Sequence, residues 1–405
     1  MRLDRRYLAV SVCGGSAFVD MYATQPLLPE LRAEFHAGEA AAGATITALT
    51  FACALAAPFV GPLADALGRK RVIVGAIFLL AFVTFGAATA HSLYALLAWR
   101  FVQGLCMPAV FAVTLAYMAE ELPPSVGGRA VGAYIAGNVL GGFLGRYAAA
   151  VVAAYAGWHA AFVVLGVMNL AGGTVVWAVL PRARRFVRQP SASAAVRTIG
   201  RFLRDPELLA TYAVGGSILF TLVAVFTFTT YHLAAPPYDL STIALGNVFF
   251  VYLAGVVVTP LAGRLIDRVG HRAALLLAIV ASTVGVLITL APSIPVIVAG
   301  LAVMSSGVFA AQAASQGYIG VLARESRSTA AALYLTVYYA GGGLGAILPA
   351  AVWSRGGWPA TVALVVAVQI VAAVVAALVW RAPHRREFRD ETAEKVNRRG
   401  RPGAA

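Results

Sequence analysis

Long apolar runs and short polar segments alternate along the whole chain. Each run has about twenty residues, enough for a helix to cross the roughly 30 Å hydrocarbon layer of a bilayer. Because lipid offers no hydrogen-bond partners, the backbone in such runs must satisfy its own polar groups, as a helix does. The pattern therefore predicts an all-α membrane protein with twelve transmembrane helices. The predicted spans are residues 7–28, 44–63, 72–90, 93–118, 130–152, 160–180, 208–230, 243–261, 273–291, 295–321, 330–351 and 361–380.

The spans fall into two halves with similar sequences, offset by about 200 residues. Segments 61–68 and 263–270 both read Gly-x-Leu-x-Asp-x-x-Gly, and Gly157-Trp158 recurs as Gly357-Trp358. Duplication of a six-helix unit, with both copies in the same orientation, explains these matches. We therefore divide the chain into two bundles, a linker and a tail. The boundaries are 1–180 for the N-terminal bundle, 181–207 for the linker, 208–380 for the C-terminal bundle and 381–405 for the tail.

Composition and charge support a membrane protein and set its orientation. Of the 405 residues, 60% are hydrophobic and 12% are charged, which does not suit a soluble core. The net charge of +14 lies between the apolar runs, so it does not indicate nucleic-acid binding. If the N-terminus is cytoplasmic, 27 of the 31 Lys and Arg residues lie on cytoplasmic segments. We therefore predict a multi-pass protein of a bacterial inner membrane with both termini in the cytoplasm.

Three motifs resemble those of the major facilitator superfamily. Segment 61–71 resembles its signature loop, segment 97–104 its fourth-span motif, and segment 137–145 the fifth-span motif of its antiporters. Gln25-Pro26-Leu-Leu-Pro29 is similar to the drug-efflux-like branch of the superfamily. The resemblance implies two pseudo-symmetric six-helix bundles, secondary active transport by alternating access and a monomeric state.

The resemblance also implies a gate on the cytoplasmic side. A carboxylate at the cytoplasmic end of span two can interact with the positive N-terminus of a neighbouring helix in one conformation and lose that contact in another. The residues expected to form this latch are Gly61, Asp65, Gly68 and Arg69, with Asp267 and Arg268 as a weaker second copy. A static turn is the alternative interpretation.

Asp20 and Arg100 are charged residues deep within predicted spans one and four. A carboxylate at such depth costs about 2.5–3.5 kcal/mol, so it must face a cavity or a partner. At 1.5 Å per residue both residues lie about 10–14 Å from the outer face, which allows a pair. By resemblance to drug and proton antiporters, we assign proton coupling to Asp20 and Arg100. The alternative is a structural carboxylate and charge neutralisation within the bundle.

Span five is rich in glycine, which allows two helices to approach closely in lipid. In antiporters of the family this motif seals the two halves on one side; here Asn138 stands where those antiporters usually have proline. The residues of this motif are Gly137, Asn138, Gly141, Gly142 and Gly145. Arg146 and His159 are expected to anchor the chain at the outer interface, since a long side chain near a span end reaches the headgroups.

Polar and aromatic residues on otherwise apolar spans are candidates for a substrate cavity, although each can instead pack or bond between helices. They are Tyr22, Gln25, Gln103, Tyr252, Gln312, Gln316, Tyr334 and Tyr338. With Arg100 as the one cation expected deep in the bundle, the sequence disfavours a strongly anionic substrate.

The function that these features favour is proton-coupled efflux of amphiphilic or drug-like small molecules. Uptake or facilitated transport of a sugar or organic acid is the alternative, and a transport-inactive sensor on the same fold is a third. Neither a Walker A loop nor a zinc-protease motif occurs, so we expect no enzyme, no catalytic residue, no metal and no cofactor. The expected partners are the substrate, protons and membrane lipids, with no nucleic acid.

Overall fold

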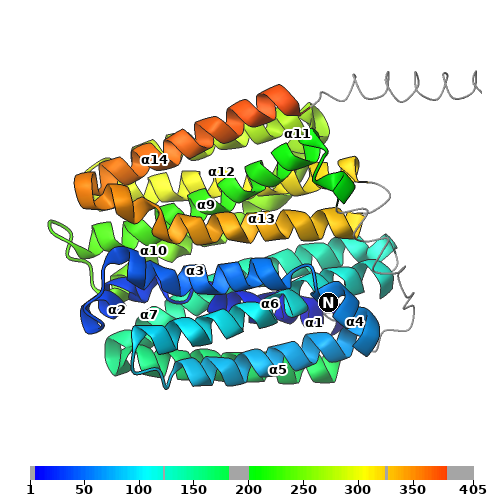
Figure 1. Cartoon of the computed structure of the whole chain (residues 1–405), viewed down its shortest axis with the longest axis horizontal. Coiled ribbons are helices and arrows are strands. Elements are labelled where there is room, and N and C mark those ends of the chain that lie inside the picture. The colour runs from blue at the N-terminus through cyan, green and yellow to red at the C-terminus, as the bar shows by residue number, and fades with distance from the viewer. Residues whose placement is uncertain (1–4, 122–123, 182–199, 324–326, 381–405) are drawn as a thin grey trace, which may run out of the picture.

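The computed structural model describes residues 5–121, 124–181, 200–323 and 327–380, and within these ranges the chain is helical without strands. The N-terminal half contains α1 to α7, and the C-terminal half contains α9 to α14 (Figure 1). The helices of the first half are α1 (Arg5–Met21), η1 (Gln25–Leu27), α2 (Leu28–Glu34), α3 (Glu39–Ala56), α4 (Val60–Leu67), α5 (Arg69–Ala87), α6 (Leu93–Glu121) and α7 (Pro124–Val179). Those of the second half are α9 (Pro206–Ala234), α10 (Thr242–Val248), η2 (Phe249–Leu253), α11 (Ala254–Ile288), α12 (Ile294–Leu322), α13 (Arg327–Ile347) and α14 (Pro349–Val379).

In the described ranges, nine helices are long and apolar enough to cross a membrane. Two of these stretches have 51 and 47 residues, and straight helices of that length would be more than twice as long as the hydrocarbon layer is thick. Gly157 and Gly270 interrupt them with φ angles of 78° and 80°, and Gly357 interrupts α14 with a φ of 56°. Glycine adopts these angles without steric cost. The breaks fall between the predicted spans, which keeps twelve crossings as the prediction.

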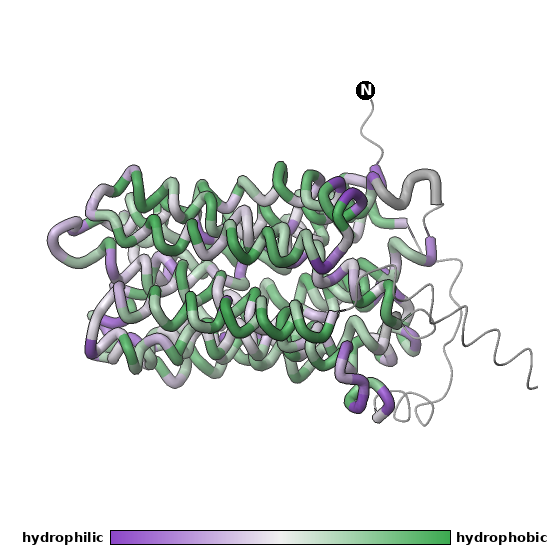
Figure 2. Tube along the Cα trace, turned by 90° about the horizontal axis from the view of Figure 1, so that it is seen from above, coloured by the Kyte–Doolittle hydropathy of each residue, from purple (hydrophilic) through white to green (hydrophobic). Residues whose placement is uncertain are grey.

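The two bundles lie side by side along their length, with α3 beside α13 at the boundary (Figure 1). Thr47 donates a hydrogen bond of 2.8 Å to the Gly343 carbonyl, and Thr336 donates one of 3.2 Å to the Ala54 carbonyl. Figure 2 shows hydrophobic residues along the middle of the bundles and hydrophilic ones mainly toward the ends. Large apolar side chains such as Phe59 are also exposed on the outside. This surface suits contact with lipid tails.

Glycines set the closest helix contacts in both halves. A Cβ atom at Gly141 would lie 2.4 Å from the Gly15 carbonyl oxygen of α1, so no larger residue fits there. In the second half, a Cβ atom at Gly341 would lie 2.2 Å from the Gly216 carbonyl oxygen of α9. The duplicated glycines therefore make the same contact twice, between spans one and five and between spans seven and eleven of the predicted order.

The predicted linker and tail are largely beyond what the structure describes. Residues 182–199 of the linker and the whole tail, 381–405, lie outside the described residues. The second bundle begins at Asp205, whose side chain accepts hydrogen bonds from the backbone N–H groups of Glu207 and Leu208. This N-cap starts α9 at Pro206, two residues before the predicted start of span seven.

Candidate functional site

Asp20 lies at the centre of a buried polar cluster within the N-terminal half. It is near the end of α1, is fully buried, and among the described residues is the one buried acid. Its Oδ2 atom accepts hydrogen bonds from Thr84 of α5 at 3.1 Å and from Asn169 of α7 at 2.5 Å. Its Oδ1 atom has no hydrogen-bond partner among the described residues. One carboxylate oxygen is therefore held in place, while the other is buried without a described partner.

Arg100 of α6 belongs to the same cluster but does not bond the Asp20 carboxylate directly. Its guanidinium donates to the backbone carbonyls of Asp20 and Met21, each at 2.9 Å, and to that of Thr45 at 3.1 Å. It also donates to the Gln103 side chain at 2.8 Å. Arg100 thus holds the C-terminal end of α1 against α3 and α6.

The expected pairing of Asp20 with Arg100 takes an indirect form. Gln103 accepts from Arg100 and donates to Thr84 at 2.8 Å, and Thr84 donates to Asp20. Gln103, which was predicted as a substrate-cavity residue, belongs to this chain of hydrogen bonds. The sequence interpretation missed Thr84 and Asn169. Asn169, an amide within an apolar span, was the available signal.

A second buried cation, Arg146 of α7, lies between the two halves, and the prediction that it anchors the outer interface was wrong. Its side chain is buried, with 1% of the residue surface exposed. Nε donates to the Gln25 side-chain oxygen at 2.7 Å and Nη1 donates to the Gly142 carbonyl at 2.6 Å. The helix carrying Arg146 runs on to the break at Gly157, so the side chain starts about 16 Å before that turn, too deep to reach the headgroups.

Aromatic rings from both halves surround Arg146. Its guanidinium carbon lies 4.8 Å from the Tyr22 ring centroid, 5.2 Å from that of Phe249 and 4.6 Å from that of Tyr252. Gln25 completes the contact by donating to Thr227 of α9 at 3.3 Å. Three of the predicted cavity residues, Tyr22, Gln25 and Tyr252, are therefore brought together here.

The two segments that supply these rings, one from each half, depart from α-helical geometry where they contact Arg146. Span one breaks after α1, and a turn with Tyr22 leads into the short 3₁₀ helix η1. Span eight likewise passes from α10 through the 3₁₀ helix η2 into α11. Interrupted helices in transporters commonly mark the binding site, since they free backbone groups and allow motion.

Among the described residues, no hydrogen bond or ring contact joins Arg146 to the predicted cavity residues on α12 and α13. The rings of Tyr334 and Tyr338 on α13 are stacked at 5.6 Å, and both residues are buried. Gln312 is half-buried and Gln316 is exposed on α12. The structure gives these two amides no shared contact with Arg146. His159, predicted as an anchor, stacks on Trp158 at 3.7 Å.

The predicted gate contains ion pairs of a buried arginine with two partly exposed carboxylates, all within the N-terminal half. Arg69, at the start of α5, binds both carboxylate oxygens of Glu120 at 2.7 and 2.5 Å and lies 3.3 Å from Asp65. Gly68 joins α4 to α5 with a φ of 90°. In the second copy, Asp267 and Arg268 are exposed. Glu120, at the end of α6, was not identified from the sequence as a partner of Arg69.

The glycines of span five face two different neighbours. Gly137, Gly141 and Gly145 meet the backbone of α1, within their own half. Gly142 faces the other half: a Cβ there would lie 3.2 Å from the Tyr252 ring and 3.3 Å from Arg146. The Asn138 side-chain oxygen is buried without a hydrogen bond, next to Gly14. Of these four glycines, Gly142 is the one that faces the boundary between the halves near Arg146.

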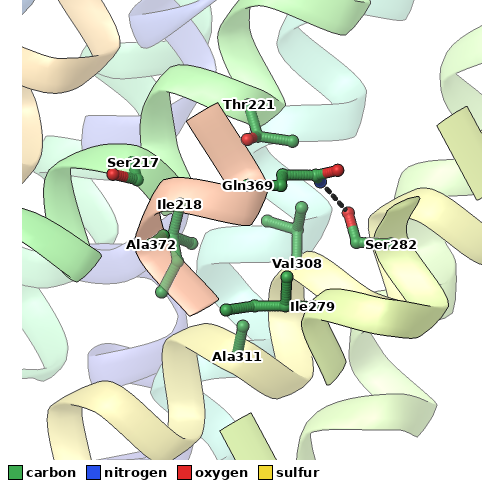
Figure 3. Close-up of a pocket in the computed structure, with 9 residues that line it drawn as sticks. All are labelled: Ser217, Ile218, Thr221, Ile279, Ser282, Val308, Ala311, Gln369 and Ala372. Atoms are coloured by element: carbon green, nitrogen blue, oxygen red, sulfur yellow. Dashed lines mark hydrogen bonds between the residues drawn. The ribbon is translucent and has the colours of Figure 1, made fainter. Parts of the chain in front are cut away.

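The C-terminal half contains a small pocket between α9, α11, α12 and α14 (Figure 3). Thr221 of α9, Ser282 of α11 and Gln369 of α14 give it polar groups, and Gln369 donates to Ser282 at 2.7 Å. Counted from Gly216 and Trp358, Thr221 and Gln369 occupy the positions that Asp20 and Asn169 hold relative to Gly15 and Trp158. The pocket is thus the neutral counterpart of the Asp20 cluster.

Comparisons with known proteins agree with this architecture. The family model of the Major Facilitator Superfamily matches residues 10–251 and 234–402. The inner membrane transport protein YnfM of Escherichia coli is 31% identical over 379 residues, covering 93% of this chain and 91% of YnfM. The uncharacterized MFS-type transporter YybF of Bacillus subtilis is 28% identical over 366 residues, covering 90% of each chain.

Two solved structures share the fold at low sequence identity. A bacterial homolog of the human lysosomal transporter Spinster, in an inward-facing and occupied conformation, superposes with a TM-score of 0.74 at 16% identity, covering 92% of this chain and 96% of the other. The nucleoside transporter NupG gives a TM-score of 0.73 at 14% identity, covering 93% and 100% of the two chains. At these identities the likeness shows the fold alone.

Proposed function

Because the chain belongs to the Major Facilitator Superfamily and is a multi-pass membrane transporter, we propose that it couples proton movement to the export of amphiphilic small molecules across the inner membrane. The two halves alternate access to a site between them, with twelve crossings and both termini in the cytoplasm. The observation that carries this proposal is the geometry around Asp20.

Asp20 has the surroundings of a group that binds and releases a proton. Thr84 and Asn169 bind one of its oxygens, and the other oxygen has no partner among the described residues and is free to take a proton. Arg100 stabilises the ionised form through its charge without sealing that oxygen in a direct ion pair. The carboxyl group is thereby kept available for protonation.

The proton site is connected to the boundary between the halves through the break in span one. Arg100 bonds the carbonyls of Asp20 and Met21, and the next residue, Tyr22, contacts Arg146. Neutralising Asp20 weakens its attraction to Arg100, which holds this end of α1. A shift of the helix end then reaches Tyr22 and Gln25 directly, because both lie within five residues of Asp20.

Export, as opposed to uptake, rests on the likeness of span five to the antiporter motif. The Arg69, Asp65 and Glu120 cluster supplies the matching cytoplasmic latch: it fixes the α4 to α5 loop within the N-terminal half. We propose that this loop exchanges contacts with the C-terminal half during the transport cycle.

The test is proton movement in proteoliposomes with an internal pH dye and an imposed substrate gradient, comparing wild type with Asp20→Asn. Thr221→Val is the matched control, since it changes the equivalent position of the other half. Substrate-driven proton flux that disappears in Asp20→Asn and survives in Thr221→Val supports the proposal. Substrate movement without proton flux in the wild type would leave a facilitator and refute the coupling.

A further inference from the structure

In the described part of the chain, the buried charged residues are three arginines and one acid, and one of the arginines has no carboxylate nearby. Asp20 is in the cluster with Arg100, and Arg69 binds Asp65 and Glu120. Arg146 forms no ion pair with any described carboxylate. The boundary between the halves therefore has one positive charge that the described part of the protein does not neutralise.

Burying a cation without a counter-charge is energetically unfavourable, so the position of Arg146 indicates where a counter-charge is needed. Removing an arginine from water costs several kcal/mol unless charges and hydrogen bonds compensate. The hydrogen bonds that Arg146 donates to Gln25 and to the Gly142 carbonyl, and the three aromatic faces, compensate for part of that cost. An anion would supply the missing charge with a bidentate contact, the interaction that guanidinium makes best.

The surroundings of Arg146 add two independent signs of a ligand site. The Tyr22 hydroxyl is buried, with the residue 2% exposed, and has no hydrogen-bond partner in the described structure. Two spans that supply contacts to Arg146 are also interrupted by 3₁₀ segments, η1 in the first half and η2 in the second. A donor without a partner and two interrupted helices around an unpaired cation are the features of a site that an anionic ligand completes.

We infer that Arg146 binds the anionic group of the transported substrate, so that the substrate is an organic anion with an apolar or aromatic body. Tyr22, Phe249 and Tyr252 pack against that body, and Gln25 and Gly142 orient the guanidinium. This inference rests on the proposed function as a transporter and names its substrate class. It replaces the expectation from sequence that a strongly anionic substrate is disfavoured.

The site spans both halves, which gives the anion a role in the cycle. Tyr22, Gln25 and Arg146 come from the first half, and Phe249, Tyr252 and Thr227 from the second. An anion bound to Arg146 neutralises the charge that the closed boundary must otherwise bury. The loaded carrier therefore closes more readily than the empty one, as obligatory coupling of substrate to the conformational change requires.

The experiment measures binding to the purified full chain in dodecyl maltoside, with no ion gradient. The probes are 1-naphthoate and its neutral isostere 1-naphthamide. Their binding is measured by equilibrium dialysis and by the rise that they cause in the melting temperature of the protein. We expect naphthoate to bind at least about tenfold more tightly than the amide in the wild type. Arg146→Gln removes that preference, and Arg146→Lys keeps part of it. Arg355→Gln, which removes an exposed arginine, leaves it unchanged.

Several outcomes would overturn the inference. Equal affinity for the acid and the amide would do so, as would an unchanged preference in Arg146→Gln. Because neutral replacement of a buried unpaired charge need not destabilise the fold, the melting temperature of Arg146→Gln without ligand shows whether that variant is folded. If phosphatidylglycerol, but not naphthoate, stabilises the protein in a manner that requires Arg146, the site binds a lipid headgroup and not a transported anion.

Failure of this inference is distinguishable from failure of the proposed function. Naphthoate binding by a wild-type protein that shows no coupled proton flux would support the anion site and refute proton coupling. Proton flux driven equally by neutral and anionic compounds would support coupling and refute the anion site.

Discussion

The two halves share one fold, but the first half has charged side chains at buried positions where the second half has neutral ones. The N-terminal half buries Asp20, Arg100 and Asn169, whereas the C-terminal half has Thr221, Leu301 and Gln369. Arg100 and Leu301 are each the eighth residue of a 29-residue helix, α6 and α12. The second half packs the same arrangement without any charge, so the fold itself does not require one. The buried charges of the first half are therefore explained by function and not by the needs of the fold.

The sharpest test of this comparison is to move the carboxylate from one half to the other. The double variant Asp20→Thr with Thr221→Asp keeps one buried acid but places it beside Leu301 instead of Arg100. We expect substrate-driven proton flux to fall to the level of empty liposomes, because the described part of the C-terminal half has no buried cation to stabilise the ionised carboxylate. Proton flux restored to wild-type level would show that either half can couple, and that Arg100 is dispensable.

A second test asks whether the two halves depend equally on their glycine contacts. Gly141→Leu and Gly341→Leu each force a side chain against the backbone of the neighbouring helix, α1 or α9. Overpacking of this kind costs about 1–3 kcal/mol or more, so we expect both variants to lower the unfolding temperature in detergent by similar amounts. Gly132→Ala is the control, since no other side chain or helix comes within 4 Å of the methyl group that it adds. A large loss in one half alone would contradict equivalent packing.

A third test concerns the gate, where the halves again differ. Glu120 binds Arg69 with both oxygens, and the equivalent position of α12 is Val321. We expect Glu120→Gln to slow transport several-fold while leaving the protein folded, because Arg69 keeps Asp65 and one amide contact. Arg268→Gln, in the exposed second copy, should have little effect. Initial transport rates in proteoliposomes with matched protein content give the comparison.

The smallest effect is expected from single hydroxyl groups. Thr84 donates to Asp20 and accepts from Gln103, while Ser282 accepts from Gln369. Removing either leaves a buried polar group short of a partner, at about 1–3 kcal/mol. We therefore expect Thr84→Val and Ser282→Ala to lower thermal stability comparably, and only Thr84→Val to reduce coupled proton flux. Equal loss of flux in both would mean that the effect is structural.

Much of the fold followed from the sequence because its determinants are local or periodic. Runs of apolar residues predicted the helices, and the gaps between the predicted spans contain the turns at Gly157 and Gly357 that the structure shows. Asp20 and Arg100 were identified as a buried set because charged residues are rare at that depth. Glu120 was harder, since it lies fifty-one residues from Arg69 along the chain and meets it only through the packing of α5 and α6.

The apolar runs and the internal repeat identified a membrane protein with two similar halves, and the rarity of charges within the runs identified Asp20 and Arg100. What each buried charge faces depends on how the helices pack. Arg146 is the clearest case: hydropathy placed it near a span end, but the direction of its side chain depends on which side of α7 meets the C-terminal half. That choice results from the contact of Gly137, Gly141 and Gly145 with α1, which turns Gly142 and Arg146 toward Tyr252. Helix rotation is set by packing between helices, and no single segment contains that information.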